Sequence, residues 1–292
     1  MASLRDVKTK IGAIKKTKQI TKAMNMVASA KLRNAQSRIE RFKPYAQKFF
    51  EMLGDLAAGA DESVHPLLAK REEKKTVGIV LVTSDRGLCG SFNVNLIKAG
   101  LKLAREKKAA GLDVKFYCVG KKGREAVRKA EYEILVQYRD VMNSFDFTLA
   151  SKLGQELINS FLDNTLDEVV LVYGEFISMA RQVPVVQAVL PISGDQAGIP
   201  AVQSSGKEYI YEPSVEGLLA ELLPRFIKVQ VYRGMLDTSA SEHAARMTAM
   251  NNATRACDDM THALTRLYNK TRQASITRDL MDIVGGAEAL KG

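Results

Sequence analysis

Apolar residues recur every three to four positions through the first sixty residues, which is the spacing of a long amphipathic helix. From Leu4 to Leu56, alternating steps of three and four residues meet sixteen positions, and thirteen of these are apolar. A helix of this length would reach about 80 Å, and only a partner helix could bury so long an apolar seam. We therefore expect residues 1–60 to form one half of a coiled coil, with a kink at Pro44.

The last third of the chain repeats the pattern. Between Leu219 and Ser275 the same stepping meets seventeen positions, of which eleven are apolar. Pro224 predicts a kink in this second helix, and Gly285-Gly286 predict its end, because glycine favours helix termination. The simplest way to bury both seams is to pair the two helices.

The pairing predicts an antiparallel coiled coil of the two ends of the chain, 1–60 and 213–292, with Ser214 as the N-cap of the second helix. Polar residues interrupt the first seam at Lys18, Thr21 and Asn25, where basic residues are dense. We expect this polar stretch to face something other than its own partner helix.

Between the two helices, short β-rich runs alternate with helical patterns. The predicted strands are 76–83, 114–119, 168–173 and 183–190, and the predicted helices are 92–109, 121–130 and 145–164. Alternating strands and helices are typical of an α/β sheet with right-handed crossovers. We expect an inserted Rossmann-like α/β domain over 75–212, with a Gly/Ser/Gln-rich loop or hairpin tip at 193–207.

The net charge of +10 lies almost wholly in the first segment. Residues 1–60 hold thirteen Lys or Arg against four Asp or Glu, a net charge of +9. A basic block indicates an acidic partner, which could be nucleic acid, an anionic membrane surface or an acidic protein surface. Residues 1–41 contain no aromatic side chain that could stack on bases, and the apolar seam requires a protein, so the pattern favours protein over nucleic acid.

The stretch Ser84–Asn93 follows a predicted strand and opens a predicted helix, the position at which an α/β fold would bind a phosphate. Its glycine spacing matches neither common phosphate-binding motif, so a structural turn is the favoured interpretation. Cys89 lies in this turn without a neighbouring histidine and is expected to be a small buried thiol. The sequence by itself predicts no catalytic group, no metal site and no cofactor.

No apolar run approaches the roughly 20 residues of a membrane-spanning helix, and the first residues lack the apolar core of a secretory signal. We also expect that no transit peptide precedes Ala2. The three cysteines are far apart, odd in number and without CxxC spacing, which argues against a disulfide framework or a zinc cluster. We expect a soluble protein that is not exported and carries reduced thiols.

Several motifs, spread from end to end of the chain, resemble the gamma subunit of bacterial F-type ATP synthases. They are Ile20–Met24, Met26–Lys31, Ser84–Asn93, Tyr209–Pro213, Ser241–Met247, Met250–Thr254 and, most specifically, Tyr268–Thr277. One departure is Asp279, where that family usually has Glu. The stretch 193–207 also lacks the cysteine pair of some photosynthetic relatives, so no thiol switch is expected.

The resemblance implies a central rotor stalk that transmits torque between a membrane c-ring and a catalytic alpha/beta ring and is not itself catalytic. It implies contact with beta subunits at Thr21, Lys22, Met24, Cys89, Arg272, Gln273, Thr277 and Asp279, and a foot that meets the c-ring and epsilon subunit at Tyr209, Tyr211 and Glu212. The implied place is the cytoplasmic face of the bacterial inner membrane, peripheral to the bilayer, with no nucleic acid bound.

Two other interpretations remain open from the residues alone. The first is a stand-alone α/β enzyme with a helical oligomerisation arm, which would bind a small molecule at the Ser84–Asn93 turn. The second is a nucleic-acid binder with a basic arm, whose affinity would fall steeply with salt.

Overall fold

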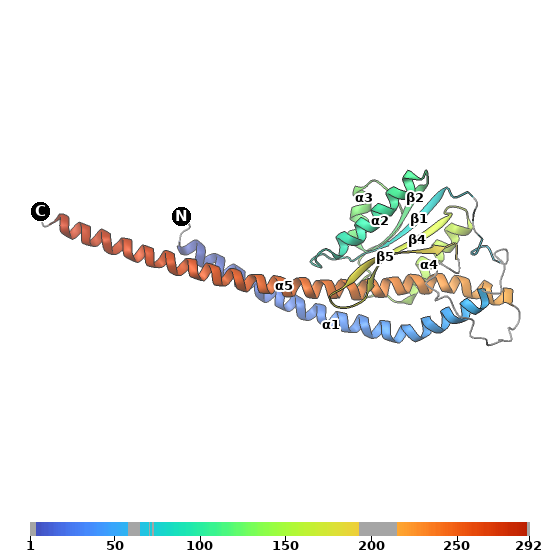
Figure 1. Ribbon diagram of the computed structural model, residues 1–292, viewed down its shortest axis with the longest axis horizontal. Coiled ribbons are helices and arrows are strands. Elements are labelled where there is room, and N and C mark those ends of the chain that lie inside the picture. The colour runs from blue at the N-terminus through green and yellow to red at the C-terminus, as the bar shows by residue number, and fades with distance from the viewer. Residues whose placement is uncertain (1–3, 58–64, 70, 72, 193–214, 291–292) are drawn as a thin grey trace. The chain divides into compact units, whose positions relative to one another are not determined.

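The computed structural model describes residues 4–57, 65–69, 71, 73–192 and 215–290. Two long helices, α1 (Leu4–Ala57) and α5 (Val215–Ala289), enclose an α/β region in the sequence (Figure 1). The chain divides into two compact units. We call Met1–Ala28 with Met247–Gly292 the distal coil, and Ser29–Arg246 the α/β unit.

A five-stranded sheet lies in the α/β unit, in the order β3-β2-β1-β4-β5. Its strands are β1 (Thr76–Val82), β2 (Asp113–Val119), β3 (Glu133–Tyr138), β4 (Glu168–Phe176) and β5 (Gln182–Leu190). The first four are mutually parallel, and β5 runs antiparallel to β4. The connecting helices are α2 (Phe92–Ala109), α3 (Lys121–Lys129) and α4 (Phe147–Leu162).

The four predicted strands and three predicted helices are confirmed, and the inserted α/β architecture with them. The strand β3 was not predicted, because its apolar run of Ile134 to Val136 is short and, as an edge strand, it has no fully buried residue. The predicted loop at 193–207 and the predicted N-cap Ser214 lie outside the described residues.

The sheet is the middle layer of three, with α2 and α3 on one face and α4 on the other (Figure 1). Alternate residues of β1 point to opposite faces: Ile79 and Leu81 pack in the α2/α3 core, and Val80 and Val82 in the core that includes α4 and α5. Fully burying an aliphatic side chain of this size stabilises the fold by about 1.5–3 kcal/mol.

In the α/β unit, α1 and α5 run antiparallel. The Phe42 ring meets the Tyr232 ring at a centroid distance of 5.0 Å, and the Phe50 ring meets the Phe226 ring at 5.6 Å, both edge to face. As the residue number rises on α1, it falls on α5. The predicted antiparallel pairing of the two ends is therefore confirmed.

The distal coil pairs the same helices through polar contacts. The Lys18 ammonium forms an ion pair with the Asp258 carboxylate. The hydroxyls of Thr21 and Thr254 lie 2.8 Å apart, and the Asn25 side-chain amide donates to the Met247 carbonyl oxygen at 2.8 Å. The expectation that this polar stretch faces something other than its partner helix is wrong, because α5 supplies a polar group opposite each of the three residues.

The seam itself is confirmed along α1, since every predicted seam position from Leu4 to Phe49 is buried or half-buried. The predicted helix end at Gly285-Gly286 is wrong, because α5 continues to Ala289 and neither glycine has a positive φ. A glycine in a helix interior destabilises the helix by only about 1 kcal/mol relative to alanine. That penalty is small enough for α5 to continue through both glycines. The helices also continue past Pro44 and Pro224, and the kinks there stay predictions.

Candidate functional site

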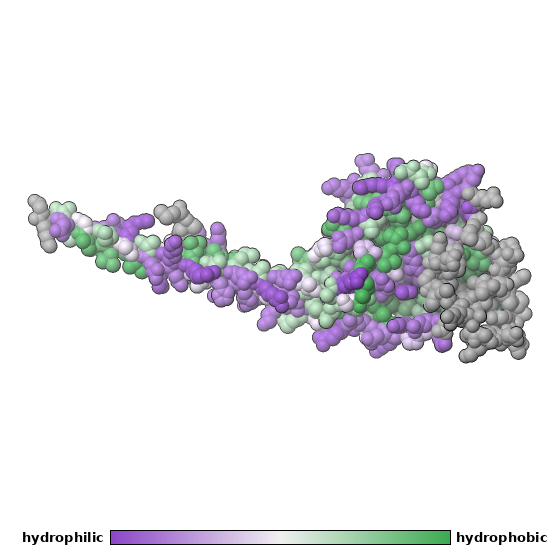
Figure 2. Space-filling model, in the orientation of Figure 1, coloured by the Kyte–Doolittle hydropathy of each residue, from purple (hydrophilic) through white to green (hydrophobic). Residues whose placement is uncertain are grey.

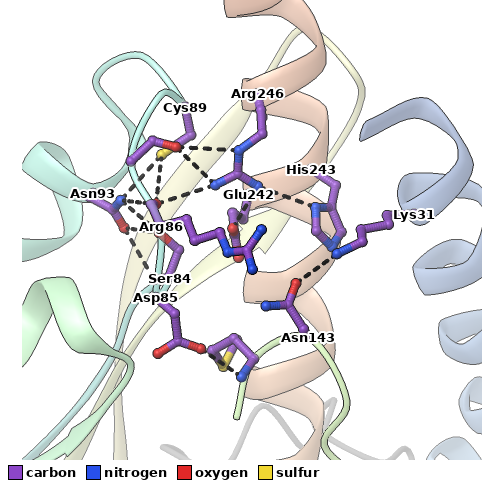
Figure 3. A network of polar contacts seen from close by, with 12 residues as sticks. Lys31, Ser84, Asp85, Arg86, Cys89, Asn93, Asn143, Glu242, His243 and Arg246 are labelled. Carbon is purple, nitrogen blue, oxygen red and sulfur yellow. Dashed lines mark hydrogen bonds and ion pairs between the residues drawn. The ribbon is translucent and has the colours of Figure 1, made fainter. Parts of the chain in front are cut away.

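The turn from Ser84 to Asn93 leaves the carboxyl end of β1 and enters α2 (Figure 3). In an open α/β sheet, the crevice beside the carboxyl ends of the strands is the usual ligand site. In this chain, side chains of the turn and of α5 meet at that place, in a network that also includes Lys31 of α1 and Asn143.

The Asp85 carboxylate accepts hydrogen bonds from three main-chain N–H groups that surround this crevice. One carboxylate oxygen accepts hydrogen bonds from the main-chain N–H groups of Lys121 at 3.0 Å and Asp140 at 2.9 Å, and the other accepts from Met142 at 2.9 Å. Lys121 is the first residue of α3, so the carboxylate lies where a helix N-terminus would otherwise bind a phosphate. The chain thus fills its own anion site.

Ser84, Cys89 and Asn93 close the turn from within. The Asn93 side-chain amide donates to the Ser84 hydroxyl oxygen at 2.7 Å and to the Cys89 sulfur at 3.2 Å. Burial raises the pKa of the Cys89 thiol, and the nearby Arg246 opposes that shift. A buried thiol with a raised pKa is a poor nucleophile at neutral pH. The predicted structural turn with a small buried thiol agrees with this geometry.

Arg246 joins the turn to α5. Its Nη1 lies 2.7 Å from the Glu242 carboxylate, and Nε and Nη2 donate to the Gly87 carbonyl oxygen at 3.3 and 3.1 Å. Nη2 also lies 3.2 Å from the Arg86 carbonyl oxygen. Burial raises the pKa of Glu242, and the Arg246 guanidinium works against that shift. This buried ion pair therefore anchors α5 to the strand–helix turn.

His243 lies beside this pair, with its Nδ1 3.4 Å from Arg246 Nη1. Burial lowers the pKa of His243 to about 4, and the positive charges of Arg246 and Lys31 add to the effect. Lys31 in turn donates to the Asn143 side-chain oxygen at 2.8 Å (Figure 3). Sequence reasoning missed Arg246, although its i,i+4 spacing from Glu242 was a usable signal.

The expected beta-contact residues on α1 fall into two kinds. Thr21 is buried against Thr254, whereas Lys22 is exposed and Met24 is half-buried. Arg272, Gln273, Thr277 and Asp279 are all exposed on α5 in the distal coil. The expected foot residues Tyr209, Tyr211 and Glu212 lie outside the described residues.

Large apolar side chains are exposed near the C-terminal end of α5. They are Ile276, Leu280, Met281, Ile283 and Val284, each more than half exposed. Ile276, Leu280, Ile283 and Val284 follow i, i+4, i+7, i+8 spacing and share one face of the helix. Figure 2 shows hydrophobic and hydrophilic residues side by side on these last turns. Exposed apolar stripes of this kind are typical of surfaces that contact a protein or a membrane.

Among the described residues, the helices include none that is long and apolar enough to cross a bilayer. Within the same residues, no three His, Cys, Asp or Glu side chains gather in a way that could hold a metal ion.

The fold defines a class of protein in which an α/β domain is inserted between two paired terminal helices. In this chain the Asp85 carboxylate takes the main-chain amide groups beside the turn after β1. A family model described as ATP synthase matches residues 3–290. ATP synthase gamma chains from Nitratidesulfovibrio vulgaris strain Miyazaki F and Lawsonia intracellularis are 70% and 55% identical, each alignment covering 100% of both chains. The chain belongs to the ATP synthase gamma chain family.

Solved structures agree with this assignment. The central stalk and c-ring structure of the Tetrahymena thermophila mitochondrial ATP synthase contains a chain that is 26% identical, with a TM-score of 0.59 over 80% of this chain and 99% of that one. A chain in the Euglena gracilis mitochondrial ATP synthase structure of OSCP, F1 and c-ring has a TM-score of 0.68 at 22% identity, covering 98% of this chain and 94% of that one. The second likeness shows the shared fold.

Proposed function

We propose that this chain is the central rotor stalk subunit of a proton-translocating F-type ATP synthase, transmitting torque between the membrane c-ring and the catalytic alpha/beta ring. The observation that carries the proposal is the pairing of the two terminal helices along one seam, which gives a shaft with basic residues on its outer surface. Family membership supports the same function, because the relatives are ATP synthase gamma chains. The subunit itself breaks no bond, and ATP chemistry belongs to the beta subunits.

The proposed partners are the alpha and beta subunits, the epsilon subunit and the c-ring. The similar solved structures are of a central stalk with a c-ring and of an assembly of OSCP, F1 and c-ring, which supports contact with F1 and with the c-ring. The exposed apolar stripe that begins at Ile276 supports insertion of the helix tip into a protein ring, because solvent would otherwise cover it. We place the complex at the cytoplasmic face of the bacterial inner membrane, with this chain peripheral.

Exposure supports most of the proposed beta-subunit contacts. Lys22 is exposed and Met24 is half-buried on α1, and Arg272, Gln273, Thr277 and Asp279 are exposed farther along α5. Thr21 is buried and contacts Thr254 of α5, so it would act by holding the neighbouring Lys22 in place and not by touching the partner. Cys89 is only 2% exposed, so a partner would touch the neighbouring Leu88, which is 63% exposed, and not the thiol.

We also propose a division of labour along the chain. Residues 1–60 and 213–292 form the shaft, and residues 75–212 form the foot, with Tyr209, Tyr211 and Glu212 meeting the c-ring and epsilon subunit. The alternative of a stand-alone enzyme with a helical arm is disfavoured, because Asp85 already takes the amide groups that a substrate phosphate would need.

The test is reconstitution with purified cognate alpha and beta subunits. With this chain present, we expect one large complex on size-exclusion chromatography and sustained ATP hydrolysis that the alpha and beta subunits alone do not show. Failure of both, with subunits shown to be folded, would overturn the proposal. A thermal-shift screen with nucleotides and phosphorylated metabolites on the free chain then tests the enzyme alternative, since a ligand that binds the native state raises Tm.

The contact residues are tested in the reconstituted membrane enzyme. We expect Lys22→Glu to lower proton pumping per ATP hydrolysed, because it reverses a charge on the basic surface that would face the proposed acidic partner. Lys129→Glu is the matched control, since Lys129 is an exposed lysine on α3 of the α/β unit. Equal pumping by both variants would contradict the assignment of Lys22.

A further inference from the structure

Three polar layers interrupt the apolar seam of the distal coil. They are Lys18 with Asp258, Thr21 with Thr254, and Asn25 with the carbonyl of Met247. They follow one another along α1 at intervals of three and four residues, so together they fill about two helical turns. Polar residues at seam positions cost stability but specify which residues of two helices face each other.

In the layer of Thr21 and Thr254, both hydroxyl protons are used in hydrogen bonds. Thr21 Oγ1 lies 3.0 Å from the Lys18 carbonyl oxygen, and Thr254 Oγ1 lies 2.8 Å from the Met250 carbonyl oxygen. Each hydroxyl has one proton, so the two hydroxyls can donate only two hydrogen bonds at a time. One hydroxyl therefore donates to the other across the interface, while the second donates to a carbonyl oxygen of its own helix. Since Thr21 is buried, an apolar group opposite it would remove the partner across the interface.

A slip of α5 by one heptad shows which polar layers lose their partner and therefore specify the register. In one direction Asp258 would face Ile11, Lys18 would face Asn251, and Thr21 would face Met247. These matches break the Lys18–Asp258 ion pair, whose side chains are 39% and 43% exposed, and they place the buried Thr21 hydroxyl against a thioether.

A slip in the other direction is less damaging but still loses the ion pair. Asp258 would face Asn25, and Lys18 would face Thr265, while Thr21 would meet Thr261 and keep a hydroxyl partner. Only the Lys18–Asp258 layer therefore discriminates against both slips. Asn25 donates to a main-chain carbonyl, and every residue of α5 offers one, so this layer supports the coil in any register.

We propose that Lys18 and Asp258, with Thr21 and Thr254, are positioning residues that lock the register of the two shaft helices. The lock determines the surface shared by the two helices, including Lys22 and Met24, that a partner meets. The register lock goes beyond the proposed function and is testable on the free chain. Its effect on torque transmission rests on the proposed function.

The register is read by disulfide formation in the full-length chain. Ile11→Cys with Leu264→Cys, in a Cys257→Ala background, reports the native register. In an antiparallel pair, residues that face each other have a constant sum of residue numbers, and Ile11 with Leu264 has the same sum as Thr21 with Thr254. Ile11→Cys with the native Cys257 reports the one-heptad slip that places Asp258 opposite Ile11. In the native register those two positions are offset by about 10 Å along the coil, beyond the roughly 7 Å that a disulfide spans.

With the polar layers intact, we expect only the native reporter to form its disulfide. With the apolar layers Lys18→Leu, Asp258→Leu, Thr21→Val and Thr254→Val, we expect the slip reporter to form as well. The charge-reversed pair Lys18→Asp and Asp258→Lys restores the native pattern. Lys16→Leu with Asp259→Leu is the matched control, because both side chains are exposed outside the layers. A slip reporter that stays silent in the apolar variant, with the native reporter still formed, would overturn the lock.

The functional arm uses the reconstituted membrane enzyme. The apolar variant is expected to assemble and hydrolyse ATP but to lose proton pumping per ATP, and the charge-reversed pair is expected to recover it. Slipped register with undiminished pumping would remove the link to torque and leave the lock standing. Failure of the unsubstituted chain to assemble with alpha and beta subunits would instead count against the proposed function.

Discussion

Arg246 on α5 donates to the carbonyl oxygen of Gly87 through both Nε, at 3.3 Å, and Nη2, at 3.1 Å. Gly87 belongs to the turn after β1, so this contact ties the long C-terminal helix to the centre of the sheet. Arg246 is also the last residue of the α/β unit. In the proposed rotor function, this contact would help to transmit force between the sheet and α5.

Arg246→Ala is expected to destabilise the α/β unit by about 3–5 kcal/mol, the range found when one partner of a buried ion pair is removed. Glu242 would remain as an uncompensated buried carboxylate. Urea unfolding of the free chain measures the loss. The control is Arg255→Ala, which removes an exposed arginine from the same helix. Equal stability of the two variants would show that the Arg246 contacts contribute nothing.

His243 should make the chain sensitive to acid. Its pKa is about 4 in the fold and about 6.5 when unfolded, so between these values the unfolded chain binds a proton that the native chain does not. Stability is therefore lost as pH falls from 6.5 to 4, by up to about 3 kcal/mol for this group. His243→Gln should flatten that part of the profile. A variant profile parallel to the wild type through this range would contradict the assignment.

Asp237 should act in the opposite direction. Burial raises its pKa to about 7, with Glu175 adding to the shift and Arg233 opposing it. Although Arg233 Nε lies 3.8 Å from the carboxylate, burial prevails because that separation is too long for a strong ion pair.

The native chain then holds a proton on Asp237 that the unfolded chain has released between pH 3.8 and 7. Its contribution to stability falls as pH rises through that window, by up to about 4 kcal/mol. Asp237→Asn keeps the shape without the titration, so its stability relative to the wild type should rise from pH 4 to pH 7. A constant difference over this range would show that Asp237 titrates normally.

Gly120 and Gly111 make a matched pair for backbone strain. Both have positive φ, of 95° and 84°, but a Cβ on Gly120 would lie 2.2 Å from the Thr83 carbonyl oxygen, whereas one on Gly111 meets nothing within 4 Å. Gly111→Ala should cost about 1 kcal/mol, the conformational penalty alone. Gly120→Ala should cost clearly more, because β1 and the start of α3 must separate. Thermal unfolding of both variants tests the difference, and equal Tm values would contradict it.

The architecture was largely predictable from local pattern. A seam from Leu4 to Leu56 has a period that only paired helices can bury, and the apolar runs of β1, β2 and β4 read as central strands because both of their faces are covered. The charge density in the first sixty residues also predicts an acidic partner, and that expectation stays a prediction. The edge strand β3 and the helix end after Gly286 escaped because their signals are weak in isolation.

Tertiary structure alone decided what the polar residues do. Lys18 and Thr21 look like breaks in a seam until α5 brings Asp258 and Thr254 opposite them, 240 and 233 residues away in sequence. Asp85 looks like part of a phosphate site until its carboxylate is seen to accept the amides of α3 and of Met142. Apolar periodicity depends on neighbours along one helix or strand, so the sequence carries it directly. A polar side chain takes its role from the partner that satisfies it, and only the folded chain supplies that partner.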